Sequence, residues 1–447
     1  MTRHRRQPGA RRGRGNAKPS GPARVTELRI ERMGRGGDGL AVDGHDQIAV
    51  SFTLPDERVE ASVRGKDAAL IAIREGSAQR SAPLCRHFGA PAIRTVPSDS
   101  PPCGACALQH WNREPYVEWK RGLLVTALLR VGIEAEVDPL VRCEPGTRRR
   151  VVLAARRTEA GVLLGFNALR SDRIVDMREC PVALPEIVSA LSALRDLLAT
   201  VMPRGGRGRV SVLATETGLD VALNHEGDVS SPIVRSLSEP FARFAVDDEI
   251  VHERTVPIIR FGSVAVTPPP GAFVQSVEAA ERTMASLVTD YLHDAKHVAD
   301  LYSGSGTFGL RLAERSAVHA FETIGEPLSA LDRAARGATG LRRITTERRD
   351  LDRRPLQPAE LEGRDGPRSK AYDGLVFDPP RAGAEAQCHA LAKAVGRRVA
   401  AVSCNPNTLA RDLAILVGGG YRIERIVPID QFLFTPHLEA VALLSRD

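Results

Sequence analysis

Two reactive side chains in the C-terminal third of the sequence stand out because of the residues around them. Cys404 lies in V-S-C-N-P-N-T, at the end of an apolar run and directly before a predicted helix. Asp378 ends the apolar run L-V-F-D and is followed by two prolines that restrict the backbone. The positive end of a helix favours the thiolate, which is the nucleophilic form of cysteine. We therefore predict a nucleophilic Cys404 in a crevice, with the rigidly held Asp378 as a ligand contact.

A glycine-rich loop upstream of these residues indicates a nucleotide-type site. The segment D-L-Y-S-G-S-G-T-F-G (300–309) follows an apolar strand and precedes a predicted helix. Its glycines let the backbone approach a ligand, and the helix start offers free amides. Glu322 ends the next predicted strand, where a carboxylate can hold both ribose hydroxyls of an adenosine. The pattern fits a nicotinamide cofactor or S-adenosylmethionine, and without a following Lys-Ser/Thr it disfavours a phosphate-binding P-loop.

The seven cysteines of the chain are an odd number in 447 residues, which does not indicate a disulfide framework. We therefore expect a reducing cytoplasm, where clustered cysteines are more often metal-bound or catalytic. Cys103 and Cys106 form the pair C-G-A-C, whose two thiolates can reach one metal corner. Sets of four cysteines hold zinc or an iron–sulfur cluster, and spacing alone does not choose between them.

The elements that must position these residues divide the chain into a tail and three domains. A chain of 447 residues with 43 % apolar and 26 % charged residues can bury sizeable cores. Short strands with glycine turns over 22–80 predict a small β-barrel, and 81–265 predicts a mixed α+β central domain. Strands and helices alternate over 266–447, which predicts an α/β, doubly wound, Rossmann-like domain.

The positive charge of the chain is concentrated at its start. The net charge is +7, and the first 24 residues hold eight Lys or Arg and no acid, so the rest sums to −1. Residues 1–21 are expected to be a disordered basic tail, either a flexible arm drawn to a polyanion or a solubilising leader. The start lacks the apolar core of a secretory signal, and the sequence has no long apolar run, so we expect no membrane segment.

Three C-terminal segments resemble the signatures of the RNA uracil-C5 methyltransferases. They are F-D-P-P-R-A-G (377–383), V-S-C-N-P-N-T-L-A-R-D-L (402–413) and T-P-H-L-E (435–439). The resemblance covers essentially the whole chain after the tail, and it implies a TRAM- or OB-like barrel, a cysteine-bearing central domain and a methyltransferase domain. It implies S-adenosylmethionine as the cofactor, Cys404 as the nucleophile and Glu439 as the general base. It also implies cofactor contacts by Gln275, in F-V-Q, by Tyr302 of the glycine loop, and by Asp378, where cofactor and target base meet.

The implied reaction explains why a cysteine is needed. C5 of uracil is too weak a nucleophile to attack a methyl sulfonium. Addition of a thiolate to C6 makes C5 an enolate-type carbon that can take the methyl group, and a base then removes the C5 proton. Cys388 has no such context and is interpreted as a core residue. Asp350, after the third predicted strand, is a candidate contact for the adenine amino group.

The resemblance also implies a [4Fe–4S] cluster, which would fold the central domain and position RNA. Its ligands in many relatives match Cys85, Cys103, Cys106 and Cys180. Relatives usually place about five residues between the first two cysteines, whereas 17 residues separate Cys85 from Cys103 here. This departure leaves Cys143 as a substitute candidate for Cys85.

The RNA partner is the least determined part of the reading. The barrel and cluster cysteines look most like relatives that act on 23S ribosomal RNA, and the T-loop uridine of transfer RNA is the alternative. The target uridine is expected to flip out of its stack to reach Cys404. Arg148, Arg149 and Arg150 could bind phosphates or form a solvated edge. A cytosine-C5 RNA methyltransferase and an inactive iron–sulfur RNA-binding protein are further alternatives, and we expect a monomer.

Overall fold

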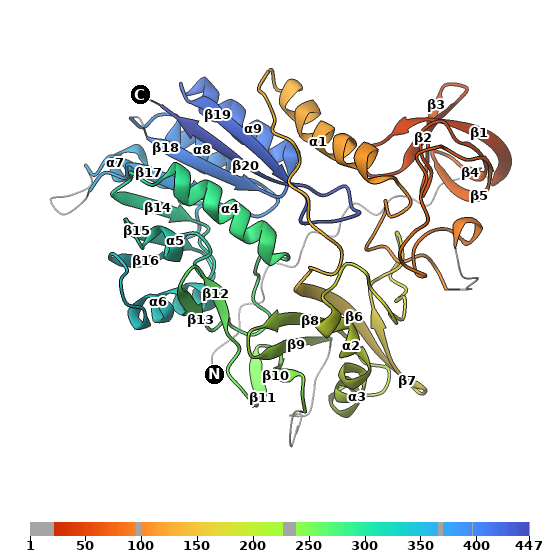
Figure 1. The fold of residues 1–447 in the computed structure, drawn as a ribbon, viewed down its shortest axis with the longest axis horizontal. Helices are drawn as coiled ribbons and strands as arrows, with labels where there is room; N and C mark the ends of the chain where they lie inside the picture. The colour runs from red at the N-terminus through yellow and green to blue at the C-terminus, as the bar shows by residue number, and fades with distance from the viewer. Residues whose placement is uncertain (1–21, 95–99, 227–237, 365–369, 396, 447) are drawn as a thin grey trace.

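The computed structural model describes residues 22–94, 100–226, 238–364, 370–395 and 397–446. The predicted basic tail, 1–21, lies outside them. Figure 1 shows an N-terminal barrel in red, a central sheet with two helices in yellow and green, and a C-terminal sheet layered with helices in green and blue. The sequence-based fold class is therefore confirmed, whereas the limits of the three domains stay predictions.

The N-terminal strands close into a barrel in the order β1-β2-β3-β5-β4. Their alternating side chains fill its interior, as in β4, where Val59, Ala61 and Val63 point inward. Closure leaves no strand edge unpaired. The strands are β1 (Arg24–Met33), β2 (Gly39–Asp43), β3 (Asp46–Val50), β4 (Arg58–Arg64) and β5 (Asp67–Glu75).

A connecting region joins the barrel to the rest of the molecule. It holds the 3₁₀ turn η1 (Pro91–Ile93) and helix α1 (Arg113–Leu129), whose buried side chains join the same core as helix α9 (Pro406–Gly418). In Figure 1, α1 lies between the barrel and the C-terminal sheet. The amides of Ala107 and Leu108 both donate to the carbonyl of Phe434, at 2.8 and 3.1 Å. The cysteine-bearing segment is thus bonded to the C-terminal domain. Within the described ranges, no helix is long and apolar enough to cross a bilayer.

The central sheet has six strands in the order β11-β10-β9-β8-β6-β7. Helices α2 (Pro185–Ser189) and α3 (Leu191–Val201) pack on one face of it. The sequence pattern predicts one helix here, but the helix is interrupted at Ala190. The strands are β6 (Arg150–Thr158), β7 (Gly161–Gly165), β8 (Arg207–Thr215), β9 (Gly218–Glu226), β10 (Phe241–Val246) and β11 (Glu249–Glu253).

The C-terminal sheet has seven strands in the order β16-β15-β14-β17-β18-β20-β19, and β20 is antiparallel to both neighbours. A two-stranded ribbon, β12 (Ile259–Phe261) and β13 (Val264–Val266), precedes it. The strands are β14 (His297–Leu301), β15 (Ala317–Glu322), β16 (Ile344–Arg348), β17 (Gly374–Phe377), β18 (Arg398–Ser403), β19 (Arg422–Ile429) and β20 (Glu439–Ser445).

Helices cover both faces of this sheet, because alternate strand residues point to opposite sides. Val298 and Val376 pack with α4, whereas Leu301 and Phe377 pack with α8 and α9. The strand order reverses between β14 and β17, and ligands of doubly wound sheets bind at the carboxyl ends beside such a point. The remaining helices are α4 (Glu278–Tyr291), α5 (Gly309–Leu312), α6 (Gly325–Gly337), α7 (Pro358–Leu361) and α8 (Glu385–Leu391).

Candidate active site

Cys404 and Glu439 lie side by side at the carboxyl edge of the C-terminal sheet. Cys404 directly follows β18, and Glu439 opens β20. The terminal pair between these antiparallel strands joins Ser403 to Ala440, so one further step places Cys404 opposite Glu439. Glu439 is buried, and Cys404 is partly exposed. The thiol is therefore accessible from outside, with a buried carboxyl group beside it.

The residues after Cys404 fix the position of the thiol. The Asn405 side chain caps α9 by accepting a hydrogen bond from the amide of Asn407, at 3.1 Å. Its Nδ2 donates to the carbonyl of Arg381 at 3.1 Å, and the Thr408 hydroxyl donates to the same carbonyl at 3.3 Å. The N-P-N-T segment thus begins a helix and also binds the D-P-P-R-A-G loop. This double role explains why the two motifs occur together.

A chain of side-chain hydrogen bonds joins Asp378 to Glu439. Gln275 Nε2 donates to Asp378 Oδ2 at 2.9 Å, and Gln431 Nε2 donates to Gln275 Oε1 at 2.7 Å. Gln431 Nε2 also donates to Glu439 Oε2. The sequence predicted Asp378, Gln275 and Glu439 but missed Gln431. Its only signal is its place in D-Q-F, one residue after the end of a predicted strand.

Burial dominates the electrostatics of this site. It raises the pKa of Asp378 to about 7, and it raises the pKa of Glu439 well above the ordinary range, with Asp378 adding to the effect. Burial and the charges of Glu439 and Asp378 raise the pKa of the Cys404 thiol to about 11, although Arg381 opposes this. Burial and the two acidic groups thus oppose the thiolate that the end of helix α9 is expected to favour.

The glycine loop follows β14 and forms an open cradle beside β15. Gly304 has a φ of +54°, and a Cβ added there would meet nothing within 4 Å. Its amide donates to Glu322 Oε2 at 3.0 Å. Glu322 Oε1 accepts from the next two backbone amides, so the carboxylate is held at the end of its strand. The hydroxyls of Ser303 and Ser305 are buried and have no hydrogen-bond partner among the described residues. These features fit a polar ligand in the cradle.

Asp300 lies at the start of this loop, with its side chain next to Gly309. It was not among the site residues predicted from the sequence. It is buried, and burial raises its pKa to about 8. A Cβ added at Gly309 would lie 2.6 Å from Asp300 Oδ2, so the third glycine leaves room for this carboxyl group. The predicted helix after the loop is short, because α5 spans only Gly309–Leu312.

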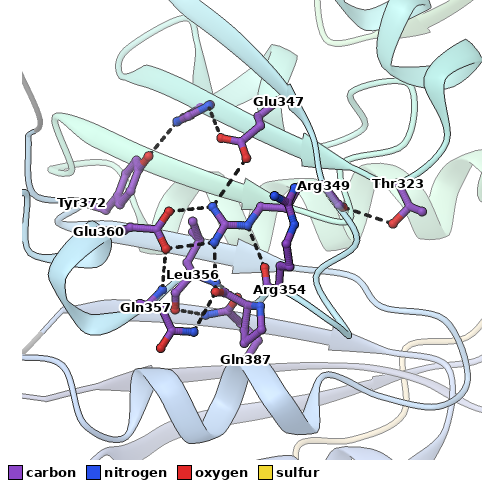
Figure 2. A network of polar contacts seen from close by, with 11 residues as sticks. Thr323, Glu347, Arg349, Arg354, Leu356, Gln357, Glu360, Tyr372 and Gln387 are labelled. Atoms are coloured by element: carbon purple, nitrogen blue, oxygen red, sulfur yellow. Dashed lines mark hydrogen bonds and ion pairs between the residues drawn. The ribbon is translucent and has the colours of Figure 1, made fainter. Parts of the chain in front are cut away.

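The opposite wall of the cradle is the loop after β16. The Tyr302 hydroxyl donates to Asp352 Oδ1 of this loop at 2.9 Å, and burial raises the pKa of Tyr302. Asp350, the adenine candidate, is partly buried in the same loop. Figure 2 shows Arg349 paired with Glu360 through two contacts of 2.6 and 2.9 Å and donating to the Arg354 carbonyl at 2.7 Å. This network fixes the loop that faces Tyr302.

The four cysteines predicted to bind a metal line a single pocket. Its other lining residues include His87, Gln109 and Glu179, and the four cysteines are Cys85, Cys103, Cys106 and Cys180. The amide of Cys103 donates to the His87 carbonyl at 2.8 Å, so the chain returns to Cys85 after the long insertion. Cys143 instead packs in the core around α4, and Cys388 is a buried core residue. The candidate replacement of Cys85 by Cys143 is therefore wrong.

Burial disfavours the thiolate form of three cysteines in this pocket, Cys85, Cys103 and Cys106. Burial raises the pKa of Cys85 to about 12 and that of Cys103 to about 11. Among the described residues, no group of three or more His, Cys, Asp and Glu side chains is arranged to hold a metal ion. The cysteines surround a common space without converging on one point.

The three consecutive arginines at 148–150 differ in environment. Arg149 is buried and pairs with Glu281, at 2.5 Å, so it is not a phosphate ligand. Arg148 lies over the Phe432 ring, 5.8 Å from its centroid. Arg150 lies over the Phe273 ring at 5.5 Å. Neither alternative, phosphate binding or a solvated edge, fits Arg149, because it is buried, whereas Arg148 and Arg150 lie against the rings of Phe432 and Phe273.

The fold and the site together define a class. The sheet is doubly wound with an antiparallel β20, a glycine cradle follows β14, and Glu322 ends β15. This is the architecture of Rossmann-like S-adenosylmethionine-dependent methyltransferases. The structure aligns over 94 % of the chain with all of Pyrococcus abyssi tRNA (uracil-54, C5)-methyltransferase in complex with S-adenosyl-L-homocysteine, with a TM-score of 0.68 and 24 % identity. That likeness confirms the fold.

Sequence comparisons place the chain more closely. A family model described as tRNA (Uracil-5-)-methyltransferase matches residues 351–447. An uncharacterized RNA methyltransferase of Brucella suis is 49 % identical over 95 % of this chain and 99 % of its own length. The 23S rRNA (uracil(1939)-C(5))-methyltransferase of Halomonas elongata is 32 % identical over 99 % of this chain and 93 % of its own. The chain belongs to the RNA uracil-C5 methyltransferase family.

Proposed function

We propose that this protein methylates C5 of a uridine in 23S ribosomal RNA through a covalent bond between Cys404 and C6 of the base. One observation carries the proposal: Cys404, directly after β18, lies opposite the buried Glu439. Hydrogen bonds of Gln431 and Gln275 connect Glu439 to Asp378. A nucleophile, a base and an orienting chain of amides are thus within one crevice.

The reaction divides into two steps on the residues of this chain. The Cys404 thiol loses its proton to solvent, its sulfur bonds to C6, and the electron pair of the C5–C6 double bond moves into an enolate. C5 of this enolate then bonds to the methyl group while the bond between that methyl group and the sulfonium sulfur breaks, which leaves the neutral thioether S-adenosylhomocysteine. Glu439 then takes the C5 proton, the C5–H electrons restore the double bond, and the C6–sulfur bond breaks to release the thiolate. The raised pKa of Glu439 suits it to accept a proton from carbon.

S-adenosylmethionine supplies the methyl group as an electrophilic sulfonium, and the glycine cradle fits its nucleoside part. The unpartnered hydroxyls of Ser303 and Ser305 and the open space at Gly304 support this. We assign Glu322 to the ribose and Tyr302 to the adenosine or methionine part. Gln275 and Asp378 would contact the cofactor where it meets the target base.

The choice of 23S ribosomal RNA rests on the extent of the similarity to the Halomonas elongata enzyme, which spans the barrel, the four pocket cysteines and the catalytic segments. The competing candidate is a uridine of transfer RNA, which the name of the Pyrococcus abyssi enzyme favours. A cytosine-C5 enzyme and an inactive RNA-binding protein are less favoured, because Cys404, Glu439 and the cradle occur together.

A trapping experiment tests the proposal. Wild-type protein and S-adenosylmethionine are incubated with 23S ribosomal RNA or transfer RNA transcripts that contain 5-fluorouridine, and the products are separated on a denaturing gel. Fluorine at C5 blocks proton removal, so we expect a protein–RNA band with the 23S transcript. Cys404→Ala should abolish this band, and Cys388→Ala, a control in the core, should retain it.

Each other outcome has a defined meaning. A band that persists in Cys404→Ala contradicts the covalent mechanism. A band with the transfer RNA transcript alone would correct the substrate and leave the mechanism intact. No band with either RNA would favour the inactive RNA-binding protein.

We also propose that Cys85, Cys103, Cys106 and Cys180 hold a [4Fe–4S] cluster. The four cysteines line one pocket, and sets of four cysteines hold iron–sulfur clusters in proteins. Bound iron would also offset the cost of buried thiolates. The pocket joins segments 85–106 and 180, so the cluster would fasten the connecting region to the central domain.

Elemental analysis of anaerobically purified protein tests this assignment. We expect iron and acid-labile sulfide in equal amounts, about four of each per chain, and their loss in Cys106→Ser. Cys143→Ser, with its thiol in a different core, should retain both. Zinc in place of iron, or full iron content in Cys106→Ser, would contradict the cluster.

A further inference from the structure

One face of the central sheet is left partly uncovered. Helices α2 and α3 fill the other face, where Val151, Leu153 and Val210 are buried. On the open face, Ala154 of β6 pairs with Arg209 of β8, which pairs in turn with Asn224 of β9. Directly paired residues of antiparallel strands point to the same side. Arg209 and Asn224 are exposed, so this part of the face is accessible.

The side chains of this open face carry uncompensated positive charge. Arg156 and Arg209 are both exposed, and neither forms an ion pair in the part of the chain that the structure describes. Arg156 pairs across β7 with Leu163, which is 37 % exposed. Arg150 lies on the same face, and burial together with the charges of Arg148 and Arg209 lowers its pKa to about 10. Among the described ion pairs, none involves Arg150, Arg156 or Arg209, and the acidic position on this face is Glu226 of β9, which pairs in register with Arg207.

The same face leads to the catalytic crevice. Arg150 Nε donates to the Ala272 carbonyl at 2.9 Å, and its guanidinium lies over the ring of Phe273, which is 66 % exposed. Gln275, which contacts Asp378, follows two residues later. Successive residues of one face are about 7 Å apart along a strand. The arginines thus form a row that begins at the mouth of the crevice.

We propose that this open face of β6, β7 and β8, with Arg150, Arg156 and Arg209, binds the phosphates of the single-stranded RNA next to the target uridine. This inference rests on the proposed function and names the surface that serves it. Guanidinium groups without acidic partners match a phosphate backbone. The exposed Leu163 and Phe273 beside them offer apolar contact to unstacked bases.

Salt dependence of binding tests the proposal without relying on the correct target RNA. The probe is a short fluorescein-labelled oligouridylate, and its affinity for the full-length protein is measured by anisotropy at several salt concentrations. Each phosphate contact on a single strand contributes about 0.7 to the slope of log K against log salt. We expect Arg156→Gln/Arg209→Gln to reduce this slope by about 1.4.

The control is Arg333→Gln/Arg342→Gln, which removes the same charge from exposed arginines on α6 and the loop after it. We expect this variant to keep the wild-type slope. An unchanged slope in Arg156→Gln/Arg209→Gln, or an equal change in the control, would overturn the proposal. If the wild type traps 5-fluorouridine RNA normally, that failure concerns only the surface and not the methyltransferase function.

A crosslinking experiment locates the RNA on the surface. p-Benzoylphenylalanine is introduced at Leu163, on the open face, or at Val395, which is 68 % exposed on the C-terminal domain. Irradiation with the labelled oligouridylate should crosslink the first protein and not the second. Equal crosslinking at both positions, or none at Leu163, would contradict the assigned surface.

Discussion

Gln431 is the residue that connects the base to the rest of the site. Its single Nε2 atom serves both Gln275 and Glu439, and the side chain is buried. The hydrogen bond to Glu439 lowers the pKa of a carboxyl group that burial raises. Gln431 therefore keeps the base ionisable while it orients Gln275, which makes it a positioning residue.

Gln431→Met should slow release of the methylated product. Loss of a hydrogen bond to a charged group costs about 1.5–3 kcal/mol, so we expect turnover to fall about tenfold to a hundredfold, with KM for RNA little changed. The pKa of Glu439 should rise further, so the acidic limb of the pH–rate profile should move to higher pH. Rapid-quench assays should show accumulated covalent complex.

The control for this variant is Gln387→Met, because Gln387 is also buried and bonded, but to the backbone of Leu356 away from the crevice. A pH profile that stays in place in Gln431→Met would show that Gln431 acts only through the fold.

At the residue scale, the sequence motifs predicted the positions of residues that local structure fixes. They did not predict properties that depend on burial. The motif places Asn405 directly before a helix, and the end of an apolar strand places Asp378 at the edge of the sheet. The structure has both residues at these positions. Gln431 was missed because its partners lie more than a hundred residues away or on the next strand. The raised pKa of Cys404 was missed because desolvation depends on packing that a helix end does not reveal.

Helix α1 holds the catalytic loop through a buried ion pair. Lys120 Nζ, which is fully buried, contacts Asp430 and donates to the Phe432 carbonyl at 2.9 Å. Tyr116 donates to Asp430 at 2.8 Å. Asp430 directly precedes Gln431, so the helix fixes the residue that orients the base.

Lys120→Met should destabilise the protein strongly, because Asp430 would remain buried without its cation. The expected cost is about 3–5 kcal/mol, seen as a lower midpoint of urea unfolding. Lys120→Met/Asp430→Asn should recover part of the loss. Arg113→Met removes an exposed pair with Glu144 and should change the midpoint little. A double variant no more stable than the single one would contradict this account.

At the element scale, periodicity predicted the kinds of elements better than their limits. The apolar spacing of 277–292 predicts a helix, and α4 spans Glu278–Tyr291 within this range, whereas the predicted helix over 186–202 is interrupted at Ala190. The helix after the glycine loop ends after four residues, although the sequence pattern extends further. Tertiary packing sets such ends, and a single sequence does not encode it locally.

At the scale of the whole molecule, alternation of strands and helices was enough to predict the fold class, whereas the division of the chain into domains stays a prediction. The long separation of Cys85 and Cys103 could not be interpreted from spacing, since an insertion can return to its starting point. The structure brings both to one pocket. The open face with its arginines could also not be predicted from the sequence, because it depends on which side of β6 the helices α2 and α3 cover.

The Phe434 carbonyl accepts hydrogen bonds from the amides of Ala107 and Leu108, and these bonds connect the cysteine pocket to the catalytic loop. Those two amides adjoin Cys106, and Phe434 lies five residues before Glu439 on the same loop. Oxidation of Cys106 that displaced its sulfur would therefore also shift the loop that ends at Glu439. An oxidant would weaken methylation from a distance, without ever reaching the nucleophile.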